Sequence, residues 1–300
     1  MRVPRTQLWQ AEQDDSAEVI RDFLVANVFT DTPLEGNQLG IFPDGRGLSH
    51  ELMLKATREM SFSETVFFVP PHEPETDAHV RIFTPSGEIP FAGHPTLGSA
   101  WVLGEMLGKT AVTLQTGAGP VPVELEREGS TTTFGWMSQP IPDWGSYEQT
   151  DELLDALGAT GKTGALPIKW YRNGPLNVYV EIVSEDALAA MAPDMQRLGR
   201  IPVNCSCFTQ APHGWTTRMF APALGVGEDP ATGSAAGPLA VHLAQHGRIK
   251  FGTQIEIRQG AQIHRPSVLY ARAEGTENSV ERVLVGGRAV VVARGEYRLG

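Results

Sequence analysis

Residues 81–100 read RIFTPSGEIPFAGHPTLGSA, and residues 218–235 read RMFAPALGVGEDPATGSA. Both stretches contain R-x-F-x-P, then a loop with glycine, then His or Asp followed by P-x-x-G-S-A at the start of an apolar segment. The loops between the two shared patterns differ in length by two residues. Two such matches about 135 residues apart are hard to obtain by chance, so the sequence predicts two copies of one structural unit.

Each copy is predicted to contain a buried central helix. The apolar segments that follow the two shared patterns have hydrophobic residues on most sides of a helix, which is typical of a buried one. Pro95 and Pro230 each stand where the first helical residue is expected. Gly108 and Gly247 stand where the two helices are expected to end.

Strands are predicted around these helices. Residues 121–126 and 253–258 alternate apolar and polar side chains, as strands with one buried face do. A further helix is predicted over residues 49–60, and further strands over residues 23–29 and 39–42. The predicted fold class is therefore α+β, with two pseudo-symmetric β-barrel-like domains, each wrapped around a central helix.

The chain is expected to divide into a short extension and two domains. Residues 1–23 are polar and largely aperiodic, which is typical of a terminal extension. The proline-rich segment 139–143 predicts a boundary between a first domain at residues 24–142 and a second at residues 143–300. The last predicted strand, residues 283–293, could belong to either domain.

The composition is that of a globular protein and excludes several partners. Hydrophobic residues make up 41% and charged residues 20% of the 300 residues, which excludes a disordered chain. The formal net charge is −11 and no basic block occurs, so nucleic acid and anionic membranes are poor candidate partners. The sequence contains no run of about 18 apolar residues. Cys205 and Cys207 are too close for an ordinary disulfide and too few for a zinc site, so we expect a cytoplasmic protein.

Glu64 lies in a stretch whose alternation places it among apolar side chains. In residues 61–68, SFSETVFF, the side chains of Phe62, Val66 and Phe68 share a face with Glu64. A buried carboxylate without an ion-pair partner has a raised pKa, which suits a general acid/base near neutral pH. The alternative is an exposed glutamate at the rim of an edge strand, with no chemical role.

His94 and Asp229 occupy equivalent positions in the repeat and are expected just ahead of each central helix. If the two copies face each other, two helix N-termini meet at a cleft, where free N–H groups and partial positive charge suit a carboxylate. The Gly-Ser pairs at 98–99 and 233–234 are expected one turn into these helices. Taken singly, Asp229 could be only an N-cap and His94 only a structural histidine. Their shared place in a duplicated motif favours a function for both.

Other patterns in the sequence are weaker indications of function. Residues 225–230 lack the third glycine of a dinucleotide-binding fingerprint, and their acidic pair would repel a pyrophosphate. Residues 233–235 do not form the G-x-S-x-G elbow of a hydrolase. His72 and His79 show no metal-ligand spacing, and the two cysteines are most simply small strand residues.

Three motifs together resemble the PhzF family of phenazine biosynthesis proteins, which shares the diaminopimelate epimerase fold. They are SETVF at residues 63–67, FAGHP at residues 91–95 and GEDPATGSA at residues 227–235. The resemblance covers nearly the whole chain from about residue 24 onward. Further matching segments are residues 139–142, 171–175, 233–240, 254–257 and 270–275.

This resemblance implies a trans-2,3-dihydro-3-hydroxyanthranilate isomerase that needs no cofactor and no metal. Glu64 would be the acid/base that removes a proton from C3 of the diene acid and returns it at C1, so that an enol forms and relaxes to a ketone. His94, Asp229 and Ser234 would be the other catalytic residues, which bind and polarise the substrate.

The resemblance also implies the substrate-binding residues and a partner. The implied substrate-binding residues are Ser63, Gly93, Thr232 and Gly233. Backbone N–H groups of the two glycines would hold the carboxylate of a small acid, and a homodimer is expected. In the epimerase branch of the fold two cysteines act as the bases. Here those places hold residues 93–94 and 228–229, so a two-cysteine racemase is disfavoured.

Two other functions fit the same residues. The protein could isomerise another conjugated amino or hydroxy acid, or it could be a catalytically silent protein that keeps the fold and binds a small acid. The presence of Glu64, His94, Asp229 and Ser234 together argues against the silent protein, because mere binding needs no poised carboxylate.

Overall fold

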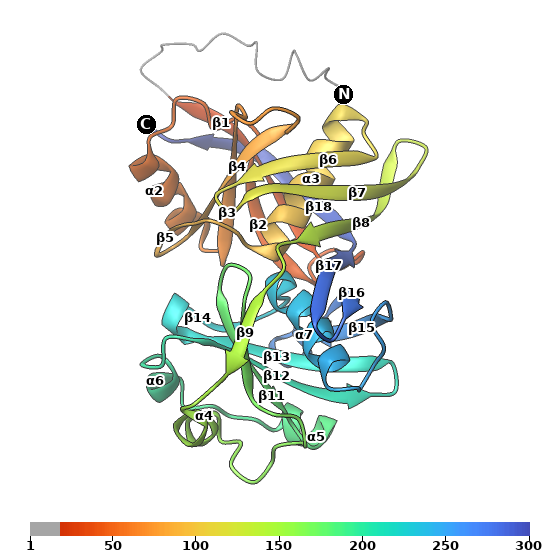
Figure 1. Ribbon diagram of the computed structural model, residues 1–300. Helices are drawn as coiled ribbons and strands as arrows, with labels where there is room; N and C mark the ends of the chain where they lie inside the picture. The colour runs from red at the N-terminus through yellow and green to blue at the C-terminus, as the bar shows by residue number, and fades with distance from the viewer. Residues whose placement is uncertain (1–18) are drawn as a thin grey trace. The chain divides into compact units, whose positions relative to one another are not determined.

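The computed structural model describes residues 19–300, which divide into two compact units (Figure 1). Among these residues, unit 1 contains the chain up to Leu34, Gln38–Ser138 and Gly286–Gly300, and unit 2 contains Glu35–Asn37 and Gln139–Val285. The division after Ser138 lies four residues before the boundary expected at residue 142. Residues 1–18 of the expected extension lie outside the described residues.

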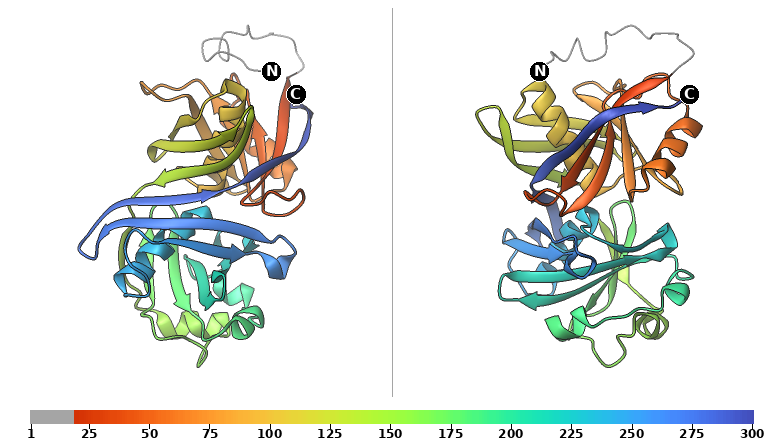
Figure 2. Two further views of the ribbon diagram at one scale, coloured as in Figure 1. Left: turned by 90° about the vertical axis from the view of Figure 1, so that its right-hand side faces the viewer. Right: turned by 180° about the vertical axis from the view of Figure 1, so that it is seen from behind.

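Unit 1 is built mainly from strands. Its elements are β1 (Ile20–Val28), β2 (Asn37–Phe42), α2 (His50–Met60), β3 (Glu64–Val69), β4 (Ala78–Thr84), β5 (Gly87–Ile89), α3 (Gly93–Leu107), β6 (Ala111–Thr116), β7 (Gly119–Glu128), β8 (Thr131–Gln139) and β18 (Ala289–Arg298). The predicted helix over residues 49–60 is α2, whose first-turn Leu52 N–H donates to the side chain of the N-cap Ser49. Figure 2 shows β1 in red and β18 in blue side by side, and they pair antiparallel.

Unit 2 has the same mixture of elements. They are β9 (Asp143–Ser146), α4 (Thr150–Leu157), β10 (Lys169–Arg172), β11 (Leu176–Glu181), α5 (Glu185–Ala189), α6 (Met195–Leu198), β12 (Asn204–Ala211), β13 (Gly214–Ala221), β14 (Val226–Asp229), α7 (Gly233–Gln245), β15 (Gln254–Gln259), β16 (Ser267–Thr276) and β17 (Ser279–Gly287). Two short 3-10 helices, η1 (Pro222–Leu224) and η2 (Ala261–Ile263), complete it.

The two units repeat the same order of strand pairing. In unit 1, β2 is parallel to β3, β3 is antiparallel to β4, β4 is antiparallel to β5 and parallel to β6, and β6 is antiparallel to β7. In unit 2, the same relations hold in the same order for β11–β12, β12–β13, β13–β14, β13–β15 and β15–β16. The long helix follows β5 in unit 1 and β14 in unit 2. The predicted pair of pseudo-symmetric units is confirmed.

The R-x-F pattern recurs because its arginine makes the same contacts in both units. Arg81 donates to both carboxylate oxygens of Glu88 at 2.6 and 2.8 Å, and Arg218 donates to those of Glu228 at 2.7 and 2.9 Å. Each glutamate lies opposite the phenylalanine of the pattern in the neighbouring strand. Each guanidinium also lies over that phenylalanine ring, at 5.2 Å in unit 1 and 4.9 Å in unit 2.

The strands of unit 1 enclose α3. Residues 93–104 of this helix are all buried. A Cβ added at Gly98 would lie 2.7 Å from the side chain of Leu39, so glycine permits the close approach of β2. α3 also contacts β1, β3, β4, β6 and β7, and β6 and β7 cross in front of it in Figure 1.

The strands of unit 2 surround α7 in the same way. Residues 233–244 are buried. The ring of His242 contacts the rings of Tyr171 in β10, Tyr179 in β11 and Phe208 in β12, and α7 also contacts β16. Burial lowers the pKa of His242 to about 3, so this histidine is a neutral core residue.

The starts of the two central helices differ from the prediction. α3 begins at Gly93, so Pro95 is its third residue, and α7 begins at Gly233, so Pro230 precedes the helix. The prediction that each proline is the first helical residue is therefore wrong. A proline is tolerated at the third position because the N–H groups of the first turn have no partner within the helix.

The two glycines expected at the ends of the central helices lie at their C-termini. Gly108 is the left-handed C-cap of α3, and Gly247, also left-handed, follows the C-cap of α7.

The single strand expected over residues 283–293 is in fact two strands, β17 and β18, separated by Arg288. The chain up to Val285 belongs to unit 2, and the rest belongs to unit 1. Within residues 19–300, every helix is too short or too polar to span a lipid bilayer.

Candidate active site

Glu64 is the first residue of β3, a strand that has a partner on both sides. Its backbone lies opposite Leu39 of β2, and the following residues pair with β4. The side chain is 16% exposed, and Val66 and Phe68 on the same face are fully buried. The alternative of a glutamate at the rim of an edge strand therefore does not apply.

Burial changes the acidity of Glu64. It raises the pKa of this carboxyl from its ordinary value of 4.5 to about 7, and a hydrogen bond with the side chain of Ser63 partly opposes the rise. A group with this pKa is present in both protonation states near neutral pH. It can therefore accept a proton as the carboxylate and give it back as the acid.

His94 lies beside Glu64 at the start of α3. It is the second residue of that helix and is 3% exposed, and its Nε2 lies 3.6 Å from Oε2 of Glu64. The N-cap residue of α3 is Ala92, which offers the helix no side-chain hydrogen bond. The N–H groups of the first turn, including that of Gly93, thus place partial positive charge in the same part of unit 1. Unit 1 brings together four predicted site residues: Ser63, Glu64, Gly93 and His94.

Asp229 is held at the end of β14 in unit 2. It is 9% exposed, its Oδ1 accepts a hydrogen bond of 2.9 Å from Asn37 Nδ2, and its Oδ2 accepts one from the Thr232 hydroxyl. The N-cap of α7 is Thr232, so Asp229 is not a helix cap. The prediction that His94 and Asp229 both precede their helices is wrong, because His94 is inside α3 while α7 starts four residues after Asp229.

Gln259 of β15 explains the later start of α7. Its Nε2 donates to the carbonyl of Asp229 at 2.8 Å and to the Thr232 hydroxyl at 3.0 Å, and its Oε1 accepts from the Thr232 N–H at 3.3 Å. These bonds hold residues 229–232 outside the helix. Gly233 and Ser234 then open α7, and the Ser234 side chain is 4% exposed. The prediction that this Gly-Ser pair lies one turn into the helix is also wrong.

Unit 2 thus brings together the other four predicted residues, Asp229, Thr232, Gly233 and Ser234. The side chain of Thr232 makes no capping bond to α7, since it is engaged with Asp229 and Gln259. As in α3, the first-turn N–H groups of α7 have no side-chain cap. That the two sets of residues serve one cleft remains a prediction.

The counterpart of Glu64 in the repeat is an amide. Thr65, which follows Glu64, pairs with Phe83, and Cys205, which follows Asn204, pairs with the equivalent Phe220. Asn204 therefore occupies in unit 2 the place of Glu64 in unit 1. Because an amide does not take up a proton near neutral pH, the pseudo-symmetric pair contains one acid/base and not two.

The cysteines are unsuited to act as bases. Cys205 and Cys207 lie in β12 as free thiols, and both are fully buried. Burial raises the pKa of Cys205 to about 12 and that of Cys207 well above its ordinary range. Both sulfurs therefore stay protonated near neutral pH.

Sequence reasoning missed Asn37 and Gln259 as partners of Asp229. Asn37 donates to Asp229 and, at 2.9 Å, to the carbonyl of Ala231. It is the first residue of β2 and is 192 residues from Asp229 in the chain, so no local pattern joins the two. Gln259 is the last residue of β15 and lies just beyond the strand predicted over residues 253–258, and its side-chain role follows only from the fold.

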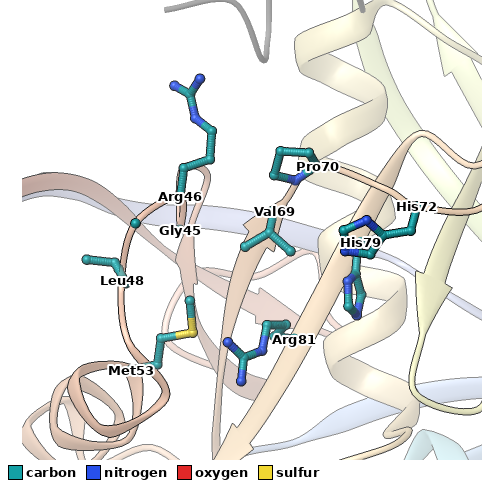
Figure 3. Close-up of a pocket in the computed structure, with 10 residues that line it drawn as sticks. Gly45, Arg46, Leu48, Met53, Val69, Pro70, His72, His79 and Arg81 are labelled. Atoms are coloured by element: carbon teal, nitrogen blue, oxygen red, sulfur yellow. The ribbon is translucent and has the colours of Figure 1, made fainter. Parts of the chain in front are cut away.

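Unit 1 contains a cavity whose lining does not include Glu64. It measures about 450 Å³ and is lined by residues 45–48, Met53, residues 69–70, His72, His79 and Arg81 (Figure 3). The rings of the two histidines are 5.8 Å apart. Arg81 is already paired with Glu88, as described above, so the cavity offers little uncompensated charge. Across residues 19–300, no group of three or more His, Cys, Asp or Glu side chains is placed to hold a metal ion.

Comparison with known proteins gives consistent matches. The model of the family described as "PhzC-PhzF: Phenazine biosynthesis-like protein" matches residues 26–295. The trans-2,3-dihydro-3-hydroxyanthranilate isomerase of Pseudomonas aeruginosa is 47% identical over 278 residues, which cover 92% of this chain and 99% of that protein.

Solved structures share the fold. The phenazine biosynthesis protein of the PhzF family from Bacillus anthracis superposes with a TM-score of 0.83 at 24% identity, and the match covers 93% of this chain and 99% of that one. A hydroxyproline epimerase from Agrobacterium vitis superposes with a TM-score of 0.69 at 13% identity, covering 95% of this chain and 93% of that one. The predicted epimerase-like fold is confirmed.

Proposed function

Because this chain belongs to the PhzC-PhzF family of phenazine biosynthesis-like proteins, we propose that it is a trans-2,3-dihydro-3-hydroxyanthranilate isomerase. One combined observation carries the proposal. The relative with that name is nearly half identical over almost its full length, and Glu64 is a shielded carboxyl with a pKa of about 7. Shielding and near-neutral acidity are what a proton-transferring carboxylate needs.

Glu64 performs the proton transfer in this proposal. Its carboxylate takes the proton from C3 of the substrate, and the electrons of the broken C–H bond move into the conjugated system. The resulting carboxylic acid gives the same proton to C1, and the enol left at C3 relaxes to a ketone. Atoms and charge balance within the substrate, so the reaction consumes no oxidant and no cosubstrate.

The other site residues bind and polarise the substrate. His94 lies close enough to Glu64, at 3.6 Å, to act on the same part of the molecule. The N–H groups of Gly93 and Gly233, at uncapped helix starts, suit the substrate carboxylate. For Asp229, Thr232 and Ser234, which unit 2 brings together, we propose the same binding and polarising role.

The proposal is tested by turnover. The purified protein is incubated with dihydrohydroxyanthranilate, without added metal, nucleotide or pyridoxal, and loss of the diene absorbance is followed. Glu64→Gln is expected to bind substrate within about tenfold of the wild type but to lose at least about 100-fold in turnover. Glu88→Gln, a matched change at an ion-paired glutamate of the same unit, serves as the control. Near-normal turnover by Glu64→Gln would remove Glu64 from the mechanism.

Two further expectations belong to this proposal. We place the reaction in the cytoplasm, where two free thiols two residues apart on one strand stay reduced. We also expect a homodimer, which light scattering on the purified protein at several concentrations would detect. A small carboxylic acid is the proposed ligand, and neither nucleic acid nor a membrane is a proposed partner.

A further inference from the structure

A proline inside α7 leaves one carbonyl of its first turn without a helical partner. Pro238 is the sixth residue of α7 and carries no N–H group. The carbonyl that this N–H would have served is that of Ser234, four residues earlier. Ser234 is one of the proposed catalytic residues, so the missing bond falls within the site.

The side chain of Asn173 supplies the missing donor. Its Nδ2 lies 3.1 Å from the carbonyl oxygen of Ser234 and 3.2 Å from Oε1 of Gln139. Both neighbours are acceptors, which fixes the orientation of the amide, because the reverse orientation would set oxygen against oxygen. Asn173 is 6% exposed, and among residues 19–300 its Oδ1 has no hydrogen-bond partner. An unpaired buried acceptor is costly, so the donor half of this amide is the half that the fold uses.

Two other side chains serve the neighbouring carbonyls. Gln139 Nε2 donates to the carbonyl of Gly233 at 2.8 Å, and the hydroxyl of Tyr179 donates to that of Ala235 at 2.8 Å. A Cβ added at Gly237 would lie 2.5 Å from Gln139 Oε1, so only glycine leaves room for this approach. Donors from three segments of unit 2 thus reach three consecutive carbonyls of the first turn of α7.

We propose that Asn173 is a positioning residue, whose amide replaces the helix donor removed by Pro238 and so holds the first turn of α7 in place for the substrate. The turn it holds carries the N–H of Gly233 and the side chain of Ser234. The effect on catalysis rests on the function proposed above, whereas the effect on the helix does not. Asn173 acts through Ser234 and has no contact with the reacting atoms in this proposal.

The proline makes a specific test possible. Asn173→Leu removes the donor at similar volume, and Pro238→Ala returns an N–H that can bond to Ser234 within the helix. If Asn173 acts through that carbonyl, the second change repairs the first. A merely structural role for Asn173, such as filling space, would gain nothing from a new N–H at residue 238.

Two measurements are made on Asn173→Leu, Pro238→Ala and the double variant. The first is amide hydrogen exchange of Ala235 and Ala236, whose N–H groups donate to the carbonyl of Thr232 in the first turn. The second is the separate determination of kcat and KM. Gln115→Leu is the control, because it removes a buried amide from unit 1 whose oxygen accepts from backbone N–H groups at residues 72 and 73.

The expected result is a selective loss and its repair. Asn173→Leu should exchange these two amides at least about tenfold faster and raise KM about tenfold, with kcat changed by less than about threefold, because ground-state and transition-state carboxylate are bound alike. The double variant should return both quantities to within about threefold of the wild type. Gln115→Leu should change neither.

Other outcomes overturn the proposal. Unchanged exchange and unchanged KM in Asn173→Leu would do so, as would a double variant no better than the single one. If Asn173→Leu does not fold, recovery of folding in the double variant supports the proposal, and failure of both while Gln115→Leu folds refutes it. If the wild type does not turn over the diene acid, the proposed function fails, while the exchange measurements still decide the role of Asn173.

Discussion

Replacement of Glu64 by glutamine should make the protein more stable, and the gain should depend on pH. The pKa of Glu64 is raised from 4.5 to about 7 in the folded protein. The folded state therefore holds this proton more tightly than the unfolded state. The stability contributed by the protonated carboxyl is fully present below pH 4.5 and is lost as the pH rises through about 7. Glutamine, which has no charged form, does not suffer this loss.

The size of the effect follows from the two pKa values. Each pH unit between them is worth about 1.4 kcal/mol, so a rise from 4.5 to about 7 corresponds to about 3 kcal/mol. Above pH 7, Glu64→Gln should be more stable than the wild type by up to this amount, and at pH 4.5 the two should be nearly equal. This is the cost in stability of keeping an ionisable group in a shielded site.

Urea unfolding at a series of pH values measures the difference. Fluorescence and circular dichroism should give coincident transitions, so that a free energy of unfolding is defined. Glu88→Gln is the control of opposite sign. The bidentate bond from Arg81 lowers the pKa of Glu88, so its replacement should destabilise the protein at neutral pH, and the difference should shrink as the pH falls. Parallel stability curves for the wild type and Glu64→Gln across the whole range would refute the reasoning.

Two further predictions concern the repeat and the thiols. Arg218→Met should cost about 3–5 kcal/mol in the free energy of unfolding, because it leaves a glutamate that is 8% exposed without its partner. The equivalent Arg81→Met, whose glutamate is 32% exposed, should cost about 1 kcal/mol or less, and equal costs in urea unfolding would contradict the account. Cys205 and Cys207 are buried and have raised pKa values, so neither should react with a thiol reagent in the native protein. Both should react in urea. Rapid labelling of the native protein would contradict this prediction, because it would show that the thiols are accessible.

The duplicated fold could be predicted because its signature is made of interacting side chains. The arginine and phenylalanine of R-x-F stack in both units, and the arginine meets a glutamate in the neighbouring strand. Such a set leaves a visible spacing in the sequence. The face of Glu64 could be predicted for a similar reason, since strand alternation fixes which side chains it shares a face with.

The details of the second unit's site could not be predicted, because tertiary hydrogen bonds decide them. Identical G-S-A triplets fall at the start of α7 but well inside α3, and bonds from Gln259 to residues 229–232 account for the late start of α7. The predicted helix also contains Pro238, but the sequence does not show which group replaces the backbone bond that this proline removes. The side chain of Asn173, 61 residues from Ser234 in the chain, compensates for it.

The central claim is that one sheltered carboxyl carries the proton between two carbons of the same substrate molecule. Substrate labelled with deuterium at C3 and converted in ordinary water in a single turnover tests it most directly, with the label at C1 of the product read by mass spectrometry or NMR. The account predicts that wild-type product retains deuterium at C1 and that Glu64→Gln forms almost no product. Complete replacement of the label by solvent hydrogen, together with near-normal turnover by Glu64→Gln, would contradict it.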